Sequence, residues 1–270
     1  MSSPLVESGA VPEAAPDLPT PDRDAAVVIE RVTKRFDNDA DKPAVLQDIS
    51  LRVNQGEFVC LLGSSGCGKS TLLSLIAGLD KPTTGTIEIP GGRQALMFQE
   101  SALFPWLTAG KNIQLALRLA GVPRAEWKAE IERLLALVHL EGQEDKRIHE
   151  LSGGMRQRVA LARALAQRAR VLLMDEPFAA LDAITRDVLH EELMRIWQEA
   201  GLTVIFVTHN VREAVRLGER VLLMSSRPGM FVRQWTVNID GPRRIESPGV
   251  AALATEITED LRREIRRHAS

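Results

Sequence analysis

The chain has 270 residues, of which 44% are apolar and 26% charged, values typical of one large globular domain or two small ones. The formal net charge of -2 lacks the basic excess expected of a nucleic-acid binder, so we expect no nucleic-acid partner. Two cysteines, Cys60 and Cys67, are too few for a disulfide scaffold. No apolar run reaches the roughly 18 residues that a transmembrane helix needs.

Residues 1–24 differ in composition from the rest of the chain. They hold five of the 14 prolines, and five acidic residues against one basic residue. Such a segment cannot bury enough apolar surface to offset the entropy lost on ordering. We therefore expect a disordered Pro-rich leader at 1–24 and a folded domain at 25–270.

The rest of the chain predicts an α/β protein. Alternating or apolar runs predict strands at 27–32, 45–53, 58–63, 86–89 and 94–98, with a helix at 69–77. Residues from about 100 to 168 have the apolar spacing of helices. Strands at 171–174 and 203–207 flank a helix near 184–200, and this βαβ order predicts parallel strands. Leu253, Ile257, Leu261 and Ile265 predict a closing amphipathic helix.

A glycine-rich segment joins the strand at 58–63 to the helix at 69–77. Residues 63–70 read GSSGCGKS and fit the pattern G-x-x-x-x-G-K-[ST]. Such loops wrap backbone N–H groups around phosphate oxygens, while the lysine reaches the β- and γ-phosphates and the last hydroxyl binds Mg²⁺. For Cys67 we favour a small, tolerated residue over a redox-sensitive thiol. The expected nucleotide-binding residues are Gly63, Ser64, Ser65, Gly66, Cys67, Gly68, Lys69, Ser70 and Thr71.

Two other apolar strands end in polar residues. Asp175 and Glu176 follow the strand at 171–174, and Thr208 and His209 follow the strand at 203–207. The carboxyl ends of parallel strands meet at one sheet edge, so we expect these residues near the phosphates. There Asp175 can hold Mg²⁺, Glu176 can polarise the attacking water, and His209 can reach a γ-phosphate. The other four histidines lack this positional support.

Residues 151–158 read LSGGMRQR and precede a helix, so Ser152, Gly153 and Gly154 form a second anion-binding helix start. We call the glycine loop and this helix start phosphate cradles. One bound nucleotide needs only one cradle within a chain, so a second cradle indicates two half-sites that meet across a dimer. The segment resembles the signature motif of ATP-binding cassette (ABC) ATPases. The resemblance covers residues 25–270, because the order of motifs also matches: glycine loop, Gln99, signature, Asp175-Glu176, Asp182 and His209.

The resemblance implies a P-loop, RecA-like ABC ATPase core with an antiparallel β subdomain and a helical subdomain at about 100–168. It also implies ATP and Mg²⁺ as cofactors. Gln99 would contact Mg²⁺ and the attacking water. Residues 152–154 would bind the γ-phosphate held by the opposite subunit, and Asp182 would lie in the loop that crosses the dimer interface. The implied catalytic residues are Lys69, Gln99, Glu176 as base and His209 as switch, and the implied metal ligands are Ser70, Gln99 and Asp175.

Three positions are noteworthy against the family pattern. The chain contains no tyrosine, so adenine stacking would pass to Phe36. Ala180 stands where serine is frequent, and Asn210 stands where aspartate is frequent after the histidine. Neither departure removes a catalytic group, so we expect an active site rather than a degenerate one.

Residues 98–108 and 174–186 resemble the nitrate, sulfonate and taurine importer ATPases. That group implies a homodimer of ATPase subunits, bound to an integral membrane permease at the cytoplasmic face of the cell membrane. It also implies an external solute-binding protein and import of an aliphatic sulfonate, taurine or nitrate. Phe104 and Trp106 lie in a proline-broken loop, where we expect an exposed partner surface in preference to local packing.

Two alternatives remain open on the sequence. One is a cassette ATPase for another cargo. The other is a non-transport cassette protein of DNA repair or translation, although repair relatives carry long coiled coils and translation relatives usually carry two cassettes.

Overall fold

The computed structural model describes residues 25–36, 43–239, 243–244 and 246–267, so the expected leader at 1–24 lies outside the described residues. The described chain is an α/β fold built on two sheets. The smaller sheet is antiparallel and has the order β2-β1-β4. Its strands are β1 (Ala25–Lys34), β2 (Leu46–Asn54) and β4 (Thr84–Glu88).

The larger sheet has the order β5-β6-β7-β3-β8-β9. Its first five strands in that order run parallel, and β9 is antiparallel to β8. Strands β3 and β7 are buried along their whole length, as their unbroken apolar runs predict. The bounds are β3 (Phe58–Gly63), β5 (Gln94–Met97), β6 (Val171–Asp175), β7 (Thr203–Thr208), β8 (Arg220–Met224) and β9 (Phe231–Thr236).

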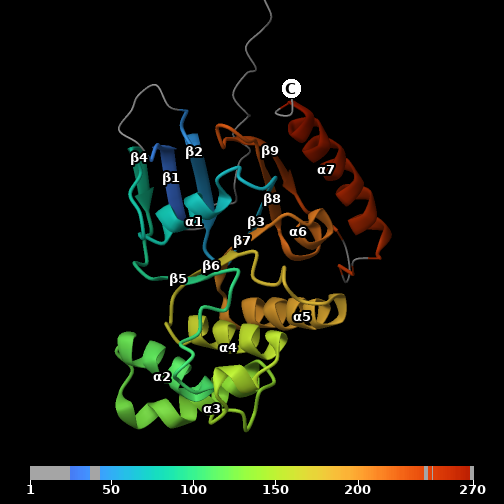
Figure 1. The fold of residues 1–270 in the computed structure, drawn as a ribbon. Helices are drawn as coiled ribbons and strands as arrows, with labels where there is room; N and C mark the ends of the chain where they lie inside the picture. Colours follow the sequence, from blue (N-terminus) through green and yellow to red (C-terminus); the bar gives the residue numbers. More distant parts are fainter. Residues whose placement is uncertain (1–24, 37–42, 240–242, 245, 268–270) are drawn as a thin grey trace, which may run out of the picture.

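All the elements between β5 and β6 in the described chain are helical. Three α-helices, α2 (Ala109–Leu119), α3 (Trp127–Leu137) and α4 (Gly153–Leu165), alternate with the short 3-10 helices η1 (Arg124–Glu126) and η2 (Ile148–Glu150). In Figure 1 they form a lobe below the sheets. We call them the helical lobe.

The other helices cover the larger sheet. They are α1 (Lys69–Ile76), α5 (Ala183–Ala200), α6 (Val211–Leu217) and α7 (Pro248–Arg267). Alternate residues of β3 face opposite sides of the sheet. Phe58 and Leu62 pack into the cluster formed with helices α2 to α7. Val59 and Leu61 pack with α1 and the smaller sheet. The site-bearing sheet is therefore held between two apolar layers (Figure 1).

The closing helix was predicted correctly, and three of its four predicted apolar residues, Leu253, Ile257 and Leu261, pack against the core. Ile265, expected on the apolar face, is 47% exposed, whereas Val250 and Ile257 are fully buried. Successive residues turn about 100° around a helix, so a strict four-residue repeat drifts by about 40° at each step. After three steps the repeat has left the sheet, and Asp260 and Glu264 take the inner positions.

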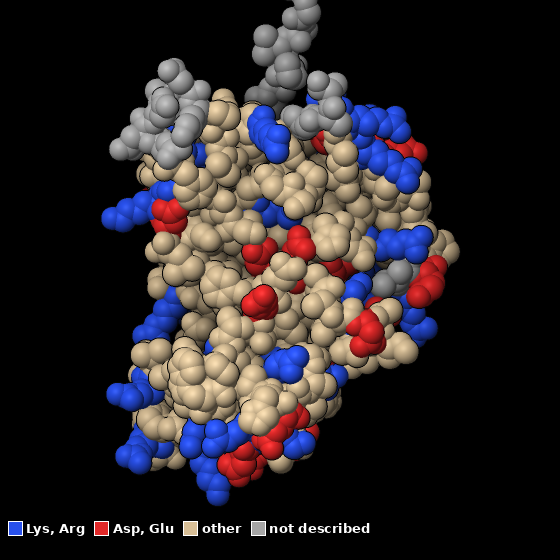
Figure 2. All heavy atoms as spheres, in the orientation of Figure 1, with Lys and Arg blue, Asp and Glu red and all other residues tan. Residues whose placement is uncertain are grey.

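No helix in the described ranges combines the length and apolar character needed to cross a bilayer. Figure 2 shows acidic side chains near the centre of one face, around the ends of β6 and β7. Lysine and arginine side chains lie mainly toward the rim of that face and on the helical lobe (Figure 2).

Candidate nucleotide site

The phosphate loop, residues 63–71, runs from the end of β3 into α1. Gly66 and Gly68 have positive φ angles of 78° and 98°, which L side chains rarely adopt. A Cβ at Gly68 would also lie 2.6 Å from Leu46 Cδ2. The Lys69 ammonium donates to the carbonyl oxygens of Gly63 at 2.8 Å and Ser64 at 2.9 Å. The loop therefore already holds its lysine over the helix N-terminus.

A turn at 226–229 packs against this loop. The Ser64 and Ser226 hydroxyl oxygens lie 2.6 Å apart, and Gly229 leaves no room for a Cβ beside the Cys67 carbonyl. Cys67 itself is 1% exposed. Burial raises the pKa of its thiol, with Lys69 acting in the opposite direction. A protonated, buried thiol fits the expected structural residue better than a redox sensor.

The acidic pair ends β6. Burial, followed by the charge of Glu176, raises the pKa of Asp175, while a hydrogen bond from Ser70 opposes that rise. Glu176 has a φ of 43°, an unusual conformation for a residue with a side chain. Its N–H donates to the Val207 carbonyl on β7 at 3.0 Å. The backbone of Glu176 is thus anchored to β7 at the point where β6 ends.

His209 follows β7 and faces Glu176. Its Nδ1 lies 2.7 Å from Glu176 Oε2, and its side chain remains 63% exposed. The sheet order places β6, β7 and β3 side by side and parallel. The acidic pair, His209 and the phosphate loop therefore share one sheet edge, as the sequence predicts.

Gln99 follows β5, which lies next to β6 on the same sheet. Its side chain is exposed, while its carbonyl accepts a hydrogen bond from Gln157 Nε2 at 2.9 Å. This contact ties the segment after β5 to α4 of the helical lobe. Gln99 thus lies at the same sheet edge as the acidic pair, and its backbone is hydrogen-bonded to the helical lobe.

The signature residues begin α4. The Ser152 hydroxyl accepts from the Met155 N–H at 3.2 Å and caps the helix, and Ser152 and Gly153 are exposed. In Figure 1, α4 lies in the helical lobe, apart from α1. Within one chain, the structure therefore does not bring the signature residues to the phosphate loop.

Two predicted binding residues lie at the periphery. Asp182 caps α5, and its Oδ1 accepts from the Thr185 N–H at 3.0 Å. That backbone hydrogen bond lowers the pKa of Asp182. Phe36 is 64% exposed, and the Lys34 ammonium lies 5.1 Å from its ring centre. An exposed ring of this kind can stack on a base.

The comparisons with known proteins identify the family. A family model described as ABC transporter matches residues 46–179. The aliphatic sulfonates import ATP-binding protein SsuB of Bacillus subtilis is 42% identical over 249 residues, covering 87% of this chain and 96% of the relative. The chain belongs to the ABC transporter family. This ABC subunit is an ATPase, and ATP is the ligand of its family.

Two further likenesses agree with this assignment. The nitrate import ATP-binding protein NrtD of Synechococcus elongatus is 42% identical, covering 86% of this ABC subunit and 90% of the relative. A solved dimer of the cassette MJ0796, in a post-hydrolysis state bound to ADP and Pi, has a TM-score of 0.70 and 32% identity. It covers 79% of this chain and 99% of its own. The predicted P-loop ABC ATPase fold is thereby confirmed.

Several polar contacts of this ABC ATPase were not expected from its sequence. Gln157 and Arg163 of α4 donate to the backbone of the segment after β5. His190 does not follow a strand end, so its sequence position predicted no role. It is 1% exposed and contacts Glu213. The sequence signal for such residues is weak, because each is a polar position on the inner face of a helix whose partner lies on another element.

Proposed function

We propose that this chain hydrolyses ATP to power the uptake of a small anion through a membrane permease. The observation that carries the proposal is the meeting of four parallel strand ends at one edge. Strand β3 supplies the phosphate loop, β6 the acidic pair, β7 His209 and β5 Gln99. Such an edge can hold a nucleotide, its metal and the attacking water together.

The residues at this edge fit Mg²⁺. Magnesium favours oxygen ligands and commonly uses only one or two protein groups beside the substrate phosphates. The Ser70 hydroxyl is close enough to the Asp175 carboxylate to lower its pKa, so two oxygen ligands lie near each other. We propose that these two groups, with Gln99, hold the ion, which would neutralise charge developing on the phosphates.

The geometry supports the following catalytic roles. Lys69, held inside the phosphate loop, would contact the β- and γ-phosphates. The Glu176 carboxylate would accept the proton of the attacking water, and His209 at 2.7 Å would hold that carboxylate and reach the γ-phosphate. Phe36 would stack on the adenine.

We propose that the working unit is a homodimer. The phosphate loop and the exposed α4 start lie on separate parts of one chain, and each is built to hold an anion. In a head-to-tail pair, Ser152, Gly153 and Gly154 of one subunit would complete the site of the other. Asp182, at the start of α5, would lie at that interface.

The segment after Gln99 fits the permease contact. Phe104 is 36% exposed and Trp106 is 69% exposed, and their ring centres lie 5.5 Å apart. Paired exposed aromatic rings favour burial against a protein partner. We place the subunit peripherally at the cytoplasmic face of the membrane, with an external solute-binding protein delivering the cargo.

The proposed cargo is an aliphatic sulfonate, taurine or nitrate. Relatives of similar identity include a sulfonate importer subunit and a nitrate importer subunit, which supports the class of small anions. The choice within that class is testable in a strain of the source organism that lacks this chain. Loss of growth on a sulfonate, but not on sulfate, would identify a sulfonate. Unimpaired growth on sulfonates and on nitrate would refute the cargo class.

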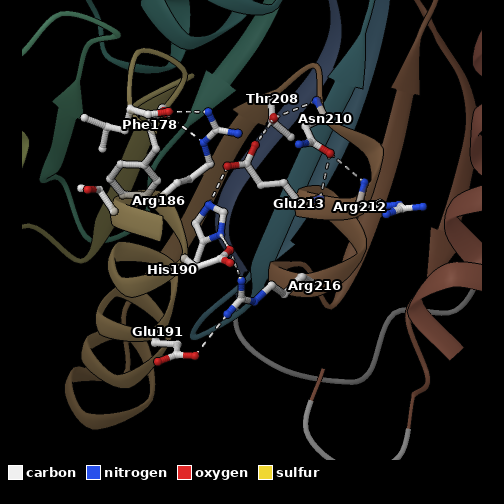
Figure 3. Close-up of polar contacts among 12 residues, drawn as sticks. Phe178, Arg186, His190, Glu191, Thr208, Asn210, Arg212, Glu213 and Arg216 are labelled. Atoms are coloured by element: carbon white, nitrogen blue, oxygen red, sulfur yellow. Dashed lines mark hydrogen bonds and ion pairs between the residues drawn. The ribbon is translucent and has the colours of Figure 1, made fainter. Parts of the chain in front are cut away.

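The catalytic assignment is tested by Glu176→Gln. The amide cannot take the proton of the attacking water, so we expect ATP binding to persist and phosphate release to slow at least about a hundredfold. Glu191→Gln on α5 is the matched control, because Glu191 is 75% exposed in its side chain and contacts only Arg216 among the residues of Figure 3. Phosphate release by Glu176→Gln near the rate of the unmodified chain would refute the assignment.

A further inference from the structure

A buried polar network lies where α5 and α6 meet the end of β7, at the residue that precedes His209 in the chain (Figure 3). Its members are His190 of α5, Glu213 of α6 and Thr208 of β7, which are 1%, 6% and 2% exposed. His190 Nε2 lies 2.6 Å from Glu213 Oε1, and the Thr208 hydroxyl donates to Glu213 Oε2. A buried carboxylate is costly unless donors surround it, so this arrangement strongly fixes all three side chains.

The network also fixes the backbone on both sides of His209. The Thr208 hydroxyl accepts from the Asn210 N–H at 3.0 Å, so one oxygen bridges Glu213 and the residue after His209. The Asn210 side chain in turn accepts from the N–H groups of Arg212 and Glu213 and caps α6. Thr208 and Asn210 are thus held to the first turn of α6 by their side chains, in addition to the backbone hydrogen bond from the Ala214 N–H to the Asn210 carbonyl at 3.0 Å (Figure 3).

His190 contacts the segment that carries Glu176 as well. Its ring packs edge-on against Phe178, two residues after Glu176, with the ring centres 5.6 Å apart. Arg186 holds that segment too, by donating to the carbonyls of Phe178 and Leu181. His190 therefore touches the base-bearing segment directly and the histidine-bearing segment through Glu213.

We propose that His190 and Glu213 are positioning residues for ATP hydrolysis, which fix the place of His209 against Glu176 through the Thr208 hydroxyl. The proposal rests on the function proposed above for Glu176 and His209. Neither positioning residue touches the nucleotide. Their effect is on how often the imidazole sits 2.7 Å from the catalytic carboxylate, because small displacements of a positioned group lower the rate of the chemical step.

The test uses the purified full chain and measures kcat and KM for MgATP. His190→Phe keeps a ring against Phe178 but removes the donor to Glu213. Thr208→Val keeps the branched shape but removes the bridging hydroxyl. We expect each to lower kcat about tenfold with KM for ATP within about twofold. His190→Gln retains an N–H donor and is expected to recover much of the lost kcat.

A double variant separates positioning from general stability. The double variant carries both His190→Phe and Thr208→Val. If His190 acts through Thr208, the kcat of the double variant should be only slightly lower than the kcat of the less active single variant. Rates are expressed per ATP-binding-competent subunit, measured with a fluorescent nucleotide. Glu191→Gln again serves as control, since it lies on α5 and pairs with Arg216 without contacting Glu213 or Phe178.

The outcomes are distinguishable. Unchanged kcat in both single variants, while Glu176→Gln is inactive, overturns the positioning inference alone. A fall in activity that only follows the loss of ATP-binding subunits also overturns it, since the residues would then support the fold and nothing more. Normal hydrolysis by Glu176→Gln overturns the proposed function on which the inference rests.

Discussion

At the scale of the residue, Glu176 and Asp175 are each held in a state that costs folding free energy. Glu176 adopts a positive φ angle, and burial raises the pKa of Asp175. An acid whose pKa is higher in the folded than in the unfolded chain destabilises the fold at a pH above both values, because its ionised form is disfavoured on folding. Stability is exchanged here for a charged carboxylate at the proposed metal site, as is usual at functional sites.

Asp175→Asn tests this directly. The amide keeps hydrogen-bonding capacity toward Ser70 but carries no charge, so we expect the nucleotide-free protein to gain about 1 kcal/mol in free energy of unfolding at pH 7. Urea unfolding followed by circular dichroism measures it, and MgATP hydrolysis should be lost in the same variant. Asp182→Asn gives the contrasting control. A backbone hydrogen bond lowers the pKa of Asp182, so that change should weaken the fold. A loss of stability in Asp175→Asn would contradict the interpretation.

Residues next to a strand end were predictable, whereas residues that act across elements were not. Asp175 ends β6 and His209 follows β7, both strongly apolar strands, and parallel strands place their carboxyl ends together. His190 and Glu213 are 23 positions apart and meet only because α5 and α6 pack on the same face of the sheet. No local pattern encodes that contact.

At the scale of the element, α4 connects the signature residues to the segment after β5. Near its end, the Arg163 guanidinium donates to the carbonyls of Ala102 at 2.7 Å and Ser101 at 3.1 Å and lies 5.9 Å from the Phe104 ring. Near its middle, Gln157 holds the Gln99 carbonyl. The proposed metal-sensing and permease-contacting residues are thus attached to the helix that begins at the signature.

Arg163→Ala should loosen that attachment. With two carbonyl acceptors released, we expect backbone amide exchange in residues 101–107 to rise about tenfold, equivalent to about 1.4 kcal/mol of local stability. Hydrogen–deuterium exchange with mass spectrometry measures it. Arg195→Ala is the matched control, because that guanidinium donates to the Leu137 carbonyl at 2.9 Å on a different helix. Equal exchange of 101–107 in both variants would show that Arg163 does not hold the segment.

Element length explains which helices and strands the sequence predicts. Strands β3 and β7 and helix α5 are long or strongly apolar, and their positions agree with the predictions within one or two residues. Helix α6 has seven residues, too few for a clear helical period, and it was missed. Strands β8 and β9 were also missed. Strand β9 lies at the sheet edge and mixes exposed and buried residues, so it lacks the continuous apolar run of a central strand.

At the scale of the whole molecule, the described chain carries one phosphate loop and one signature in separate places. If each chain used only its own residues, the exposed α4 start would have no phosphate to bind. In the proposed homodimer each cradle would have a ligand, and closure of the dimer would be linked to the γ-phosphate. The two cradles in the sequence predict this arrangement.

Gly153→Asp isolates the intersubunit contact from the fold. A Cβ at Gly153 would meet no atom nearer than Arg156 Nη2 at 3.9 Å, so a side chain fits within the chain. A carboxylate in the first turn of α4 also interacts favourably with the helix dipole, so we expect unchanged or higher thermal stability. Toward a partner's γ-phosphate, however, the same charge is repulsive. We expect ATP affinity within about twofold of the unmodified chain and ATPase activity at least about a hundredfold lower.

The decisive measurement is light scattering after gel filtration, in a Glu176→Gln background that retains ATP. That background should form a dimer with MgATP and remain monomeric with ADP, while adding Gly153→Asp should leave it monomeric with either nucleotide. Gly153→Ala controls for the added Cβ, since it brings bulk without charge and should still dimerise. An ATP-bound dimer of the Gly153→Asp variant would mean that the α4 start does not face a phosphate. In the chain that keeps Glu176, a Gly153→Asp variant that stays monomeric and hydrolyses ATP at the normal rate would place the complete site within one chain.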